Sequence, residues 1–278
     1  MIKPDPNASA GPAINIAVAL ACEARPLIEH FGLKRQTQAA YPVYQGGHIQ
    51  LIVAGVGQLN AATAVGYLAG LTQHPAAWLN IGIAGHKTHA IGALYLAHKI
   101  TRQQDSHSWY PAFTFKPGIA TASLTSFSQP VTDYEDDVLH DMEAAGFYPA
   151  ASRFSSVEFV HCLKVVSDNA EHPDHKLDKH WVSQQIAAQL KPLSGFITKL
   201  HTDLARWHEI TAVPSLYDEL LQHWHFSTYQ QHQLQQLLKR WSTCHADEEW
   251  CAADMAKLKN SREILRYLER TLDIETGV

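Results

Sequence analysis

The alternation of apolar and helical segments over the first 190 residues is the strongest constraint on the fold of this chain. Apolar runs typical of strands buried on both faces stand at 14–20, 49–54, 77–83, 93–100 and 157–167. Helical segments are predicted at 58–73, 141–151 and 176–190. Because alternating strands and helices usually build one sheet covered on both faces, we predict an α/β fold. The expected core is a mostly parallel, twisted central sheet flanked by helices.

The pattern changes near Gly195, and helical spacing of apolar residues continues from there to the end of the sequence. Three stripes carry it, at 216–224, 234–241 and 264–272, each giving a helix with one apolar face. We therefore predict a disordered segment at 1–12, an α/β domain at 13–195 and a helical extension at 196–278. Apolar stripes need a surface to cover them, so the extension is expected to cap the core or to mediate a homo-oligomer.

Composition and charge exclude several classes of protein. The formal net charge is −5, with 22 basic and 27 acidic residues, whereas a nucleic-acid-binding face would be basic. The longest apolar runs fall short of the ~20 residues of a membrane span, so no membrane partner is expected. The N-terminal residues lack the features of a signal peptide, and the four cysteines show no CxxC spacing. These features favour a reduced, cytoplasmic protein.

The eighteen histidines raise the question of a metal site. Several cluster at 171–175 and at His180, and imidazole is a good zinc ligand. Their spacings repeat no ligand pattern, and His175 and His180 would not share a helix face. We therefore expect no metal and no cofactor.

Two short segments suggest a ligand site. The first, 141–145 (DMEAA), places Asp141 as the N-cap of the predicted helix and Glu143 in its first turn. The second, 165–168 (VVSD), ends an apolar strand on Ser167 and Asp168, where ligands bind in open α/β sheets. Both segments also have a purely structural interpretation, because Ser and Asp favour turns and acidic residues favour helix N-termini.

Further segments occur in a fixed order around these two. They are 21–27 (ACEARPL) after the first strand, 51–57 (LIVAGVG) before a helix rich in small residues, and 78–85 (WLNIGIAG). Together with 141–145 and 165–168, they resemble the superfamily of purine nucleoside phosphorylases and methylthioadenosine–adenosylhomocysteine nucleosidases. The resemblance covers roughly residues 14–190, so the helical extension would be an addition to the family's fold.

The resemblance implies a role for several residues. Asp168 would be the general acid that protonates the leaving purine, with Ser167 orienting it, and Glu23, in a loop after the first strand, would activate the attacking water. Glu143 would bind the ribose hydroxyls. The other expected substrate contacts are Met142, Gly55, Asn80, Gly82 and Ala84. The implied activity is hydrolysis of the N-glycosidic bond of a purine-type nucleoside, with that small molecule as partner.

Two other functions remain open at this point. In a phosphorylase of the same superfamily an arginine would precede the central glycine, whereas this chain has Asn80, and Glu23 would repel phosphate. Arg25 keeps a phosphate-binding role open. The third hypothesis is a non-catalytic nucleoside-binding or scaffold protein that acts through its helical extension.

The chain also departs from the family's pattern. Ile83 stands where the nucleosidases often have Ser, His86 stands where they usually have Gly, and 119–124 (IATASL) replaces the usual base-pocket segment. The connection to Asp141 is short and acidic. The contacts to the base and to the 5′ group are therefore not transferable, and the sequence does not identify the nucleoside.

Overall fold

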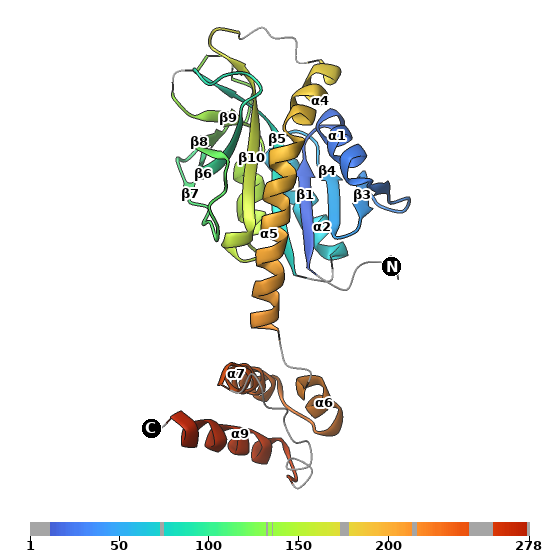
Figure 1. The fold of residues 1–278 in the computed structure, drawn as a ribbon, viewed down its shortest axis with the longest axis vertical. Helices are drawn as coiled ribbons and strands as arrows, with labels where there is room; N and C mark the ends of the chain where they lie inside the picture. The colour runs from blue at the N-terminus through green and yellow to red at the C-terminus, as the bar shows by residue number, and fades with distance from the viewer. Residues whose placement is uncertain are drawn as a thin grey trace. The chain divides into compact units, whose positions relative to one another are not determined.

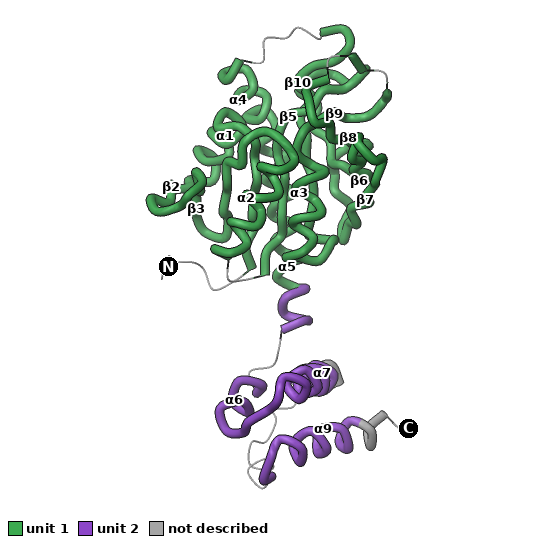
Figure 2. Tube along the Cα trace, turned by 180° about the vertical axis from the view of Figure 1, so that it is seen from behind, with its two compact units in different colours: residues 1–206 green, residues 207–278 purple. Residues whose placement is uncertain are grey.

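The computed structural model of the chain describes residues 12–72, 75–131, 133–134, 136–172, 178–212, 216–244 and 258–276. The chain divides into two compact units, Met1–Arg206 and Trp207–Val278 (Figure 2). Unit 1 holds the sheet. The segment predicted to be disordered, 1–12, lies outside the described residues except for Pro12.

Unit 1 is built on one sheet, and five of its strands, β1, β4, β5, β6 and β10, correspond to the predicted apolar runs. β4, β1, β5 and β10 lie side by side in parallel, and their apolar residues are buried because both faces of the sheet are covered. In chain order the strands are β1 (Ala13–Val18), β2 (Lys34–Arg35), β3 (Val43–Gly46), β4 (Ile49–Val53), β5 (Ala76–His86), β6 (Leu94–Arg102), β7 (Ser108–Trp109), β8 (Ala120–Ser126), β9 (Leu139–Asp141) and β10 (Val160–Asn169).

The sheet is mixed and closes on itself at one end. β10 pairs with both β5 and β6, and β8 and β9 lead back to β5, so these five strands form a ring. Within the ring, β10–β6 and β5–β9 are antiparallel, and β2 and β3 extend the other edge in antiparallel pairs. The α/β class is confirmed, but the sheet is mixed rather than mostly parallel. The sequence does not reveal this because β2, β3, β7 and β9 are too short to form apolar runs.

Helices cover both faces of the sheet in unit 1. On one face lie α1 (Ala21–Phe31), α4 (Lys179–Ala188) and the first turns of α5 (Leu190–Thr211) (Figure 1). On the other lie α2 (Gln58–Leu71) and α3 (Ala144–Ala151), seen in front in Figure 2. Each helical layer buries its own apolar cluster against the strands. The result is a three-layer arrangement in which the loops at the carboxyl ends of the parallel strands stay accessible.

Two local predictions need correction. The helix predicted at 141–151 begins at Ala144, and Asp141 instead ends β9, from where its Oδ2 accepts the Ala144 N–H at 2.9 Å. Glu143 therefore occupies the N-cap position of α3. The segment after the first strand, expected to be a loop, is the first turn of α1 and carries Glu23.

Unit 2 has an apolar core of its own. It contains α6 (Leu216–His223), α7 (Thr228–Cys244) and α9 (Ser261–Thr276), whose facing side chains form one buried cluster that includes Leu220, Leu234 and Leu268. The boundary between the units follows Arg206, whereas the sequence analysis placed it at 195. The difference arises because Phe196 and Leu200, early in α5, pack in the apolar cluster of the sheet.

Candidate functional site

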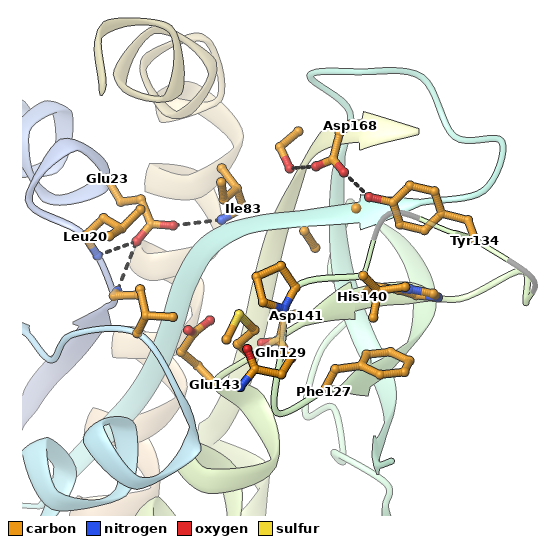
Figure 3. A pocket seen from close by; sticks show the side chains of 18 residues that line it. Leu20, Glu23, Ile83, Phe127, Gln129, Tyr134, His140, Asp141, Glu143 and Asp168 are labelled. Atoms are coloured by element: carbon orange, nitrogen blue, oxygen red, sulfur yellow. Dashed lines mark hydrogen bonds between the residues drawn. The ribbon is translucent and has the colours of Figure 1, made fainter. Parts of the chain in front are cut away.

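A cavity of ≈ 340 Å³ opens at the carboxyl ends of the parallel strands of unit 1 (Figure 3). Its walls come from the end of β1, the end of β5, the end of β10, and the segment that runs from β9 into α3. This is the edge of an α/β sheet where ligands generally bind. Glu23, Glu143 and Asp168 all line this cavity.

Backbone donors fix the Glu23 carboxyl group. Its Oε2 accepts the N–H groups of Ala19 and Leu20 at 3.0 and 2.8 Å, and its Oε1 accepts that of Ile83 at 3.0 Å. Three of about four lone-pair positions of a carboxylate are thereby used, which leaves one on Oε1. Burial raises the pKa of Glu23 above its ordinary value, against the opposing effects of Lys164 and the backbone donors.

Gly82 keeps the space beside Glu23 open. A Cβ atom at this position would lie 2.8 Å from Glu23 Oε1 and 3.5 Å from Lys164 Nζ. Because Oε1 is held by the Ile83 N–H, the carboxylate could not move aside freely. A residue without a side chain is thus required at position 82, where the strand passes close to Glu23 and Lys164.

Glu143 is held between α2 and a buried lysine. Its Oε1 accepts the Gly57 N–H at 3.0 Å at the start of α2, and its Oε2 lies 3.9 Å from Lys164 Nζ. Burial raises the pKa of Glu143 to about 7; Lys164 opposes this shift, and Asp141 and Glu23 add to it. At neutral pH this carboxyl group is therefore divided between its protonated and ionised forms.

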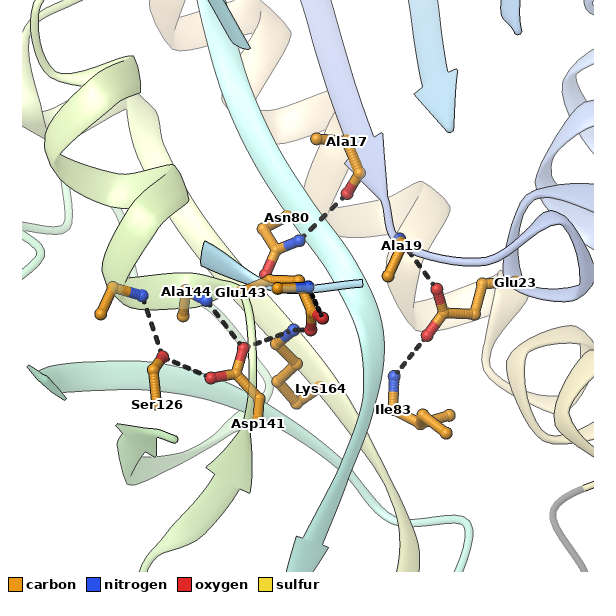
Figure 4. A network of polar contacts seen from close by, with 12 residues as sticks. Ala17, Ala19, Glu23, Asn80, Ile83, Ser126, Asp141, Glu143, Ala144 and Lys164 are labelled. Atoms are coloured by element: carbon orange, nitrogen blue, oxygen red, sulfur yellow. Dashed lines mark hydrogen bonds and ion pairs between the residues drawn. The ribbon is translucent and has the colours of Figure 1, made fainter. Parts of the chain in front are cut away.

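Asp141, which lines the cavity, forms a buried ion pair with Lys164 (Figure 4). Lys164 Nζ lies 2.9 Å from Asp141 Oδ2, and Ser126 Oγ donates to Asp141 Oδ1 at 2.5 Å. Burial alone would lower the pKa of Lys164, but the Asp141 and Glu143 carboxylates overcome this effect and raise it. Lys164 therefore stays charged and partly balances the carboxyl groups around it.

Asp168 lies at the far end of the cavity and accepts two side-chain donors. Ser167 Oγ donates to its Oδ1, and Tyr134 Oη donates to its Oδ2. Tyr134 comes from the connection between β8 and β9, and its side chain is buried against Gly85. The tyrosine hydroxyl thus lies where a ligand atom would have to meet Asp168.

The remaining predicted residues divide into two groups. Met142, Ala84 and Ser167 line the cavity, whereas Gly55, Asn80, Gly82 and Arg25 do not. Asn80 is buried and donates to the Ala17 carbonyl at 3.2 Å, so its amide joins two strands. Arg25 points away on the exposed face of α1, where it pairs with Glu29 at 2.9 Å.

Sequence reasoning missed several residues of the site. Lys164 was detectable as the one charged residue in the apolar run 157–167 apart from Glu158. Phe127, Tyr134 and His140 line the cavity from the β8–β9 connection and from β9. The segment 119–124, which replaces the family's base-pocket segment in the sequence, is mostly strand β8, and the cavity is lined by the residues that follow it. The pairing of β9 with β5, which brings His140 in, leaves no local signal in the sequence.

The described residues were also compared with the requirements of metal binding and thiol chemistry. Among the described residues, no cluster of three His, Cys, Asp or Glu side chains is arranged to hold a metal ion; part of the histidine-rich segment, 173–177, lies outside them. Burial raises the pKa of the Cys22 and Cys162 thiols, which keeps them protonated and unreactive. No helix in the described part of the chain combines the length and apolarity needed to cross a membrane.

Comparison with solved structures defines the fold of unit 1. The apo 5′-methylthioadenosine nucleosidase of Arabidopsis thaliana superposes with a TM-score of 0.56 at 18% identity, covering 70% of this chain and 96% of that one. The 5′-methylthioadenosine/S-adenosylhomocysteine nucleosidase of S. pneumoniae, solved with a transition-state inhibitor, gives 0.54 at 17% identity, covering 66% and 98%. A futalosine hydrolase mutant of Helicobacter pylori gives 0.53 at 14% identity, covering 68% and 100%.

These similarities settle the class of the fold. The sequence matches no protein-family model and no curated protein sequence. The chain nevertheless shares the fold of these nucleosidases, which is the fold that the resemblance in the sequence motifs led us to expect. The solved structures match about two thirds of the chain.

Proposed function

We propose that this protein is a nucleosidase that hydrolyses the N-glycosidic bond of a purine-type nucleoside. One observation carries the proposal: the carboxyl groups of Glu23, Glu143 and Asp168, from three separate elements, line a single cavity at the carboxyl edge of the sheet. The solved structures that share the fold are nucleosidases and a futalosine hydrolase by name, which supports the same class of reaction.

Asp168 is the proposed general acid. Cleavage of the bond leaves an electron-rich purine, and proton donation to that leaving group typically contributes about 10²–10⁴-fold to the rate. Asp168 meets the requirement for position, because its Oδ2 already accepts a hydrogen bond from the Tyr134 hydroxyl inside the cavity. Ser167, which donates to Oδ1, fixes the carboxyl group so that Oδ2 faces the ligand.

Glu23 is the proposed base for water. Its Oε1 keeps one acceptor position after the Ile83 N–H is satisfied, and Glu23 lines the cavity. The raised pKa of Glu23 makes it a stronger base than an ordinary glutamate. A water molecule in the cavity would donate a hydrogen bond to this oxygen and lose a proton to it as the water attacks the sugar.

Glu143 is the proposed ribose anchor. A carboxylate can accept hydrogen bonds from two neighbouring hydroxyl groups, and such charge-assisted bonds are stronger than neutral ones. Its Oε2 lies 3.9 Å from Lys164, beyond a direct hydrogen bond, so it remains able to accept from a ligand. Met142, which also lines the cavity, would cover the apolar face of the sugar.

Water is favoured over phosphate as the nucleophile by the charge of the site. Glu23, Asp141 and Glu143 surround Lys164, so the region is acidic and disfavours an anion. Arg25, the residue that could have bound phosphate, lies on the exposed face of α1 and pairs with Glu29. A phosphorylase would need a cation that faces the cavity.

The proposal is tested by following release of free base from a panel of purine nucleosides. Asp168→Asn and Glu23→Gln are each expected to reduce turnover by about 10²–10⁴-fold while retaining nucleoside binding by calorimetry. Glu29→Gln, on the same helix as Glu23 but exposed, is the matched control and should act like the wild type. Nucleoside binding without base release by the wild type would instead indicate a binding protein.

A further inference from the structure

Three strands bring His140, Gly85 and Asp168 into one row. Gly85 of β5 pairs with His140 of β9 on one side and with Asp168 of β10 on the other. Residues paired in this way project to the same face of the sheet, and His140 and Asp168 both line the cavity. Two strand spacings of about 4.8 Å separate their backbones. Because Gly85 has no side chain, a slot is left between the two.

An aromatic ring already occupies this slot. The Tyr134 hydroxyl lies directly over Gly85, where a Cβ atom would be only 2.2 Å away from it, and it donates to Asp168. The Tyr134 ring centroid lies 5.0 Å from that of His140 (Figure 3). The slot therefore accepts a flat ring that presents one polar atom to Asp168. The leaving base of a nucleoside has this shape, and in the proposed reaction one of its ring nitrogens would accept a proton from Asp168 at the place of that hydroxyl.

His140 is a buried polar side chain whose hydrogen-bonding capacity is unused. It is 8% exposed, and neither Nδ1 nor Nε2 has a hydrogen-bond partner among the described residues. Its ring touches Phe127 at a centroid distance of 4.8 Å as well as Tyr134. A buried polar group left without a partner is unfavourable, so its presence at a cavity wall calls for a partner supplied by a ligand.

We propose that His140 is a specificity-determining residue that hydrogen-bonds the edge of the purine base opposite the edge held by Asp168. This inference rests on the proposed nucleosidase function and adds how the base is recognised. The base takes the place of the Tyr134 ring over Gly85, with its five-membered ring toward Asp168 and its six-membered ring toward His140. A ring nitrogen of the six-membered ring is the atom that His140 contacts.

The state of His140 suits this role. Burial lowers its pKa, while Asp136 and Asp141 oppose the shift, so the imidazole is neutral at pH 7. A neutral imidazole offers one donor and one acceptor, and the tautomer can match either a bare or a protonated ring nitrogen. Phe127, at the edge of the His140 ring, provides an apolar wall that strengthens a hydrogen bond made there.

The test compares kcat/KM for a purine ribonucleoside and for its 1-deaza and 3-deaza analogues. His140→Phe keeps an aromatic ring and removes both nitrogens, whereas His140→Gln keeps a donor and an acceptor. We expect His140→Phe to lower kcat/KM for the parent nucleoside by about tenfold to a hundredfold, and His140→Gln to lower it less. One of the two deaza analogues lacks the nitrogen that His140 contacts. For that analogue we expect a low kcat/KM with the wild type and no further decrease with His140→Phe. Far-UV circular dichroism checks the fold, and His140→Leu replaces a His140→Phe protein that does not fold.

The outcomes separate this inference from the proposed function. A wild type that releases base from the parent, combined with a His140→Phe protein of equal activity, overturns the role of His140 alone. An equal loss for the parent and both analogues does so too, because the effect would then be structural. A wild type that releases no base from any purine nucleoside overturns the nucleosidase proposal, and this inference with it.

Discussion

At the level of single residues, the ionisation of Glu143 is the property most open to measurement. Its pKa is raised to about 7, and in the proposed function the ionised form is the one that would accept two ribose hydroxyl groups. In the wild type, kcat/KM should therefore rise with pH, about tenfold per unit below 7, and level off above it. Glu143→Gln should be less active and should lose this rising limb. If kcat/KM of Glu143→Gln still rose with pH below 7, the rise would belong to the ionisation of another group.

The same residue makes a prediction about stability. Between the ordinary pKa of 4.5 and the folded-state value of about 7, the folded protein binds more protons at Glu143 than the unfolded chain does. The contribution of Glu143 to the free energy of unfolding thus falls as pH rises through this window. Glu143→Gln removes this titration. Urea denaturation should therefore show that the free energy of unfolding falls less between pH 5 and pH 7.5 in the variant than in the wild type. An identical decrease in both proteins would contradict the assigned pKa.

At the level of elements, β10 carries both the proposed general acid, Asp168, and the buried cation, Lys164. Lys164 is buried, like almost all of this strand. Its ammonium group pairs with Asp141 of β9 at 2.9 Å. The same strand thus carries Asp168 at its end and, through the pair of Lys164 with Asp141, is tied to β9 in the ring of strands. Removing one partner of such a pair leaves an uncompensated charge in the interior.

Lys164→Met is accordingly expected to lower the free energy of unfolding by about 3–5 kcal/mol. Asp141→Asn removes the facing charge, so the double variant should be more stable than the sum of the two single effects predicts. Denaturant titration of all four proteins in this cycle measures the coupling. Strict additivity would show that the two side chains do not interact in solution.

Elements could be predicted from the sequence where neighbouring residues determine them. The long parallel strands and α2 were predicted because apolar runs and small-residue helices are encoded within a few neighbouring residues. The helix α1 was missed because Pro26 and the buried Glu23 interrupt the usual amphipathic pattern. The ring closure, the ion pair of Lys164 and the approach of His140 to Asp168 depend on pairings between distant segments. Glu23, Glu143 and Asp168 were proposed from family motifs, and their roles stay predictions.

At the level of the whole molecule, two apolar cores belong to two units. Unit 1 contains the sheet and the cavity, and the cluster of α6, α7 and α9 covers the apolar stripes of unit 2 internally. Leu268, fully buried in that cluster, can therefore be changed without touching the cavity. The proposed chemistry requires unit 1, and no residue of unit 2 lines the cavity among those described.

Leu268→Ala is expected to destabilise unit 2 by about 2–5 kcal/mol, because it opens a cavity in a small core. Base release per folded molecule at 25 °C should stay at the wild-type value. Calorimetry follows the unfolding transition, with Tyr229→Ala, at a side chain that is 72% exposed, as control. A proportional loss of base release and of unit 2 stability would show that unit 2 takes part in catalysis.

The central claim is that water, activated by Glu23, attacks the sugar. It is tested most directly by the sugar product that the wild type forms from a purine nucleoside with and without inorganic phosphate. The account predicts free ribose in both conditions, at the same rate, because the cavity region is acidic and Arg25 faces away from it. Phosphate-dependent formation of ribose 1-phosphate would contradict it and would make the protein a phosphorylase.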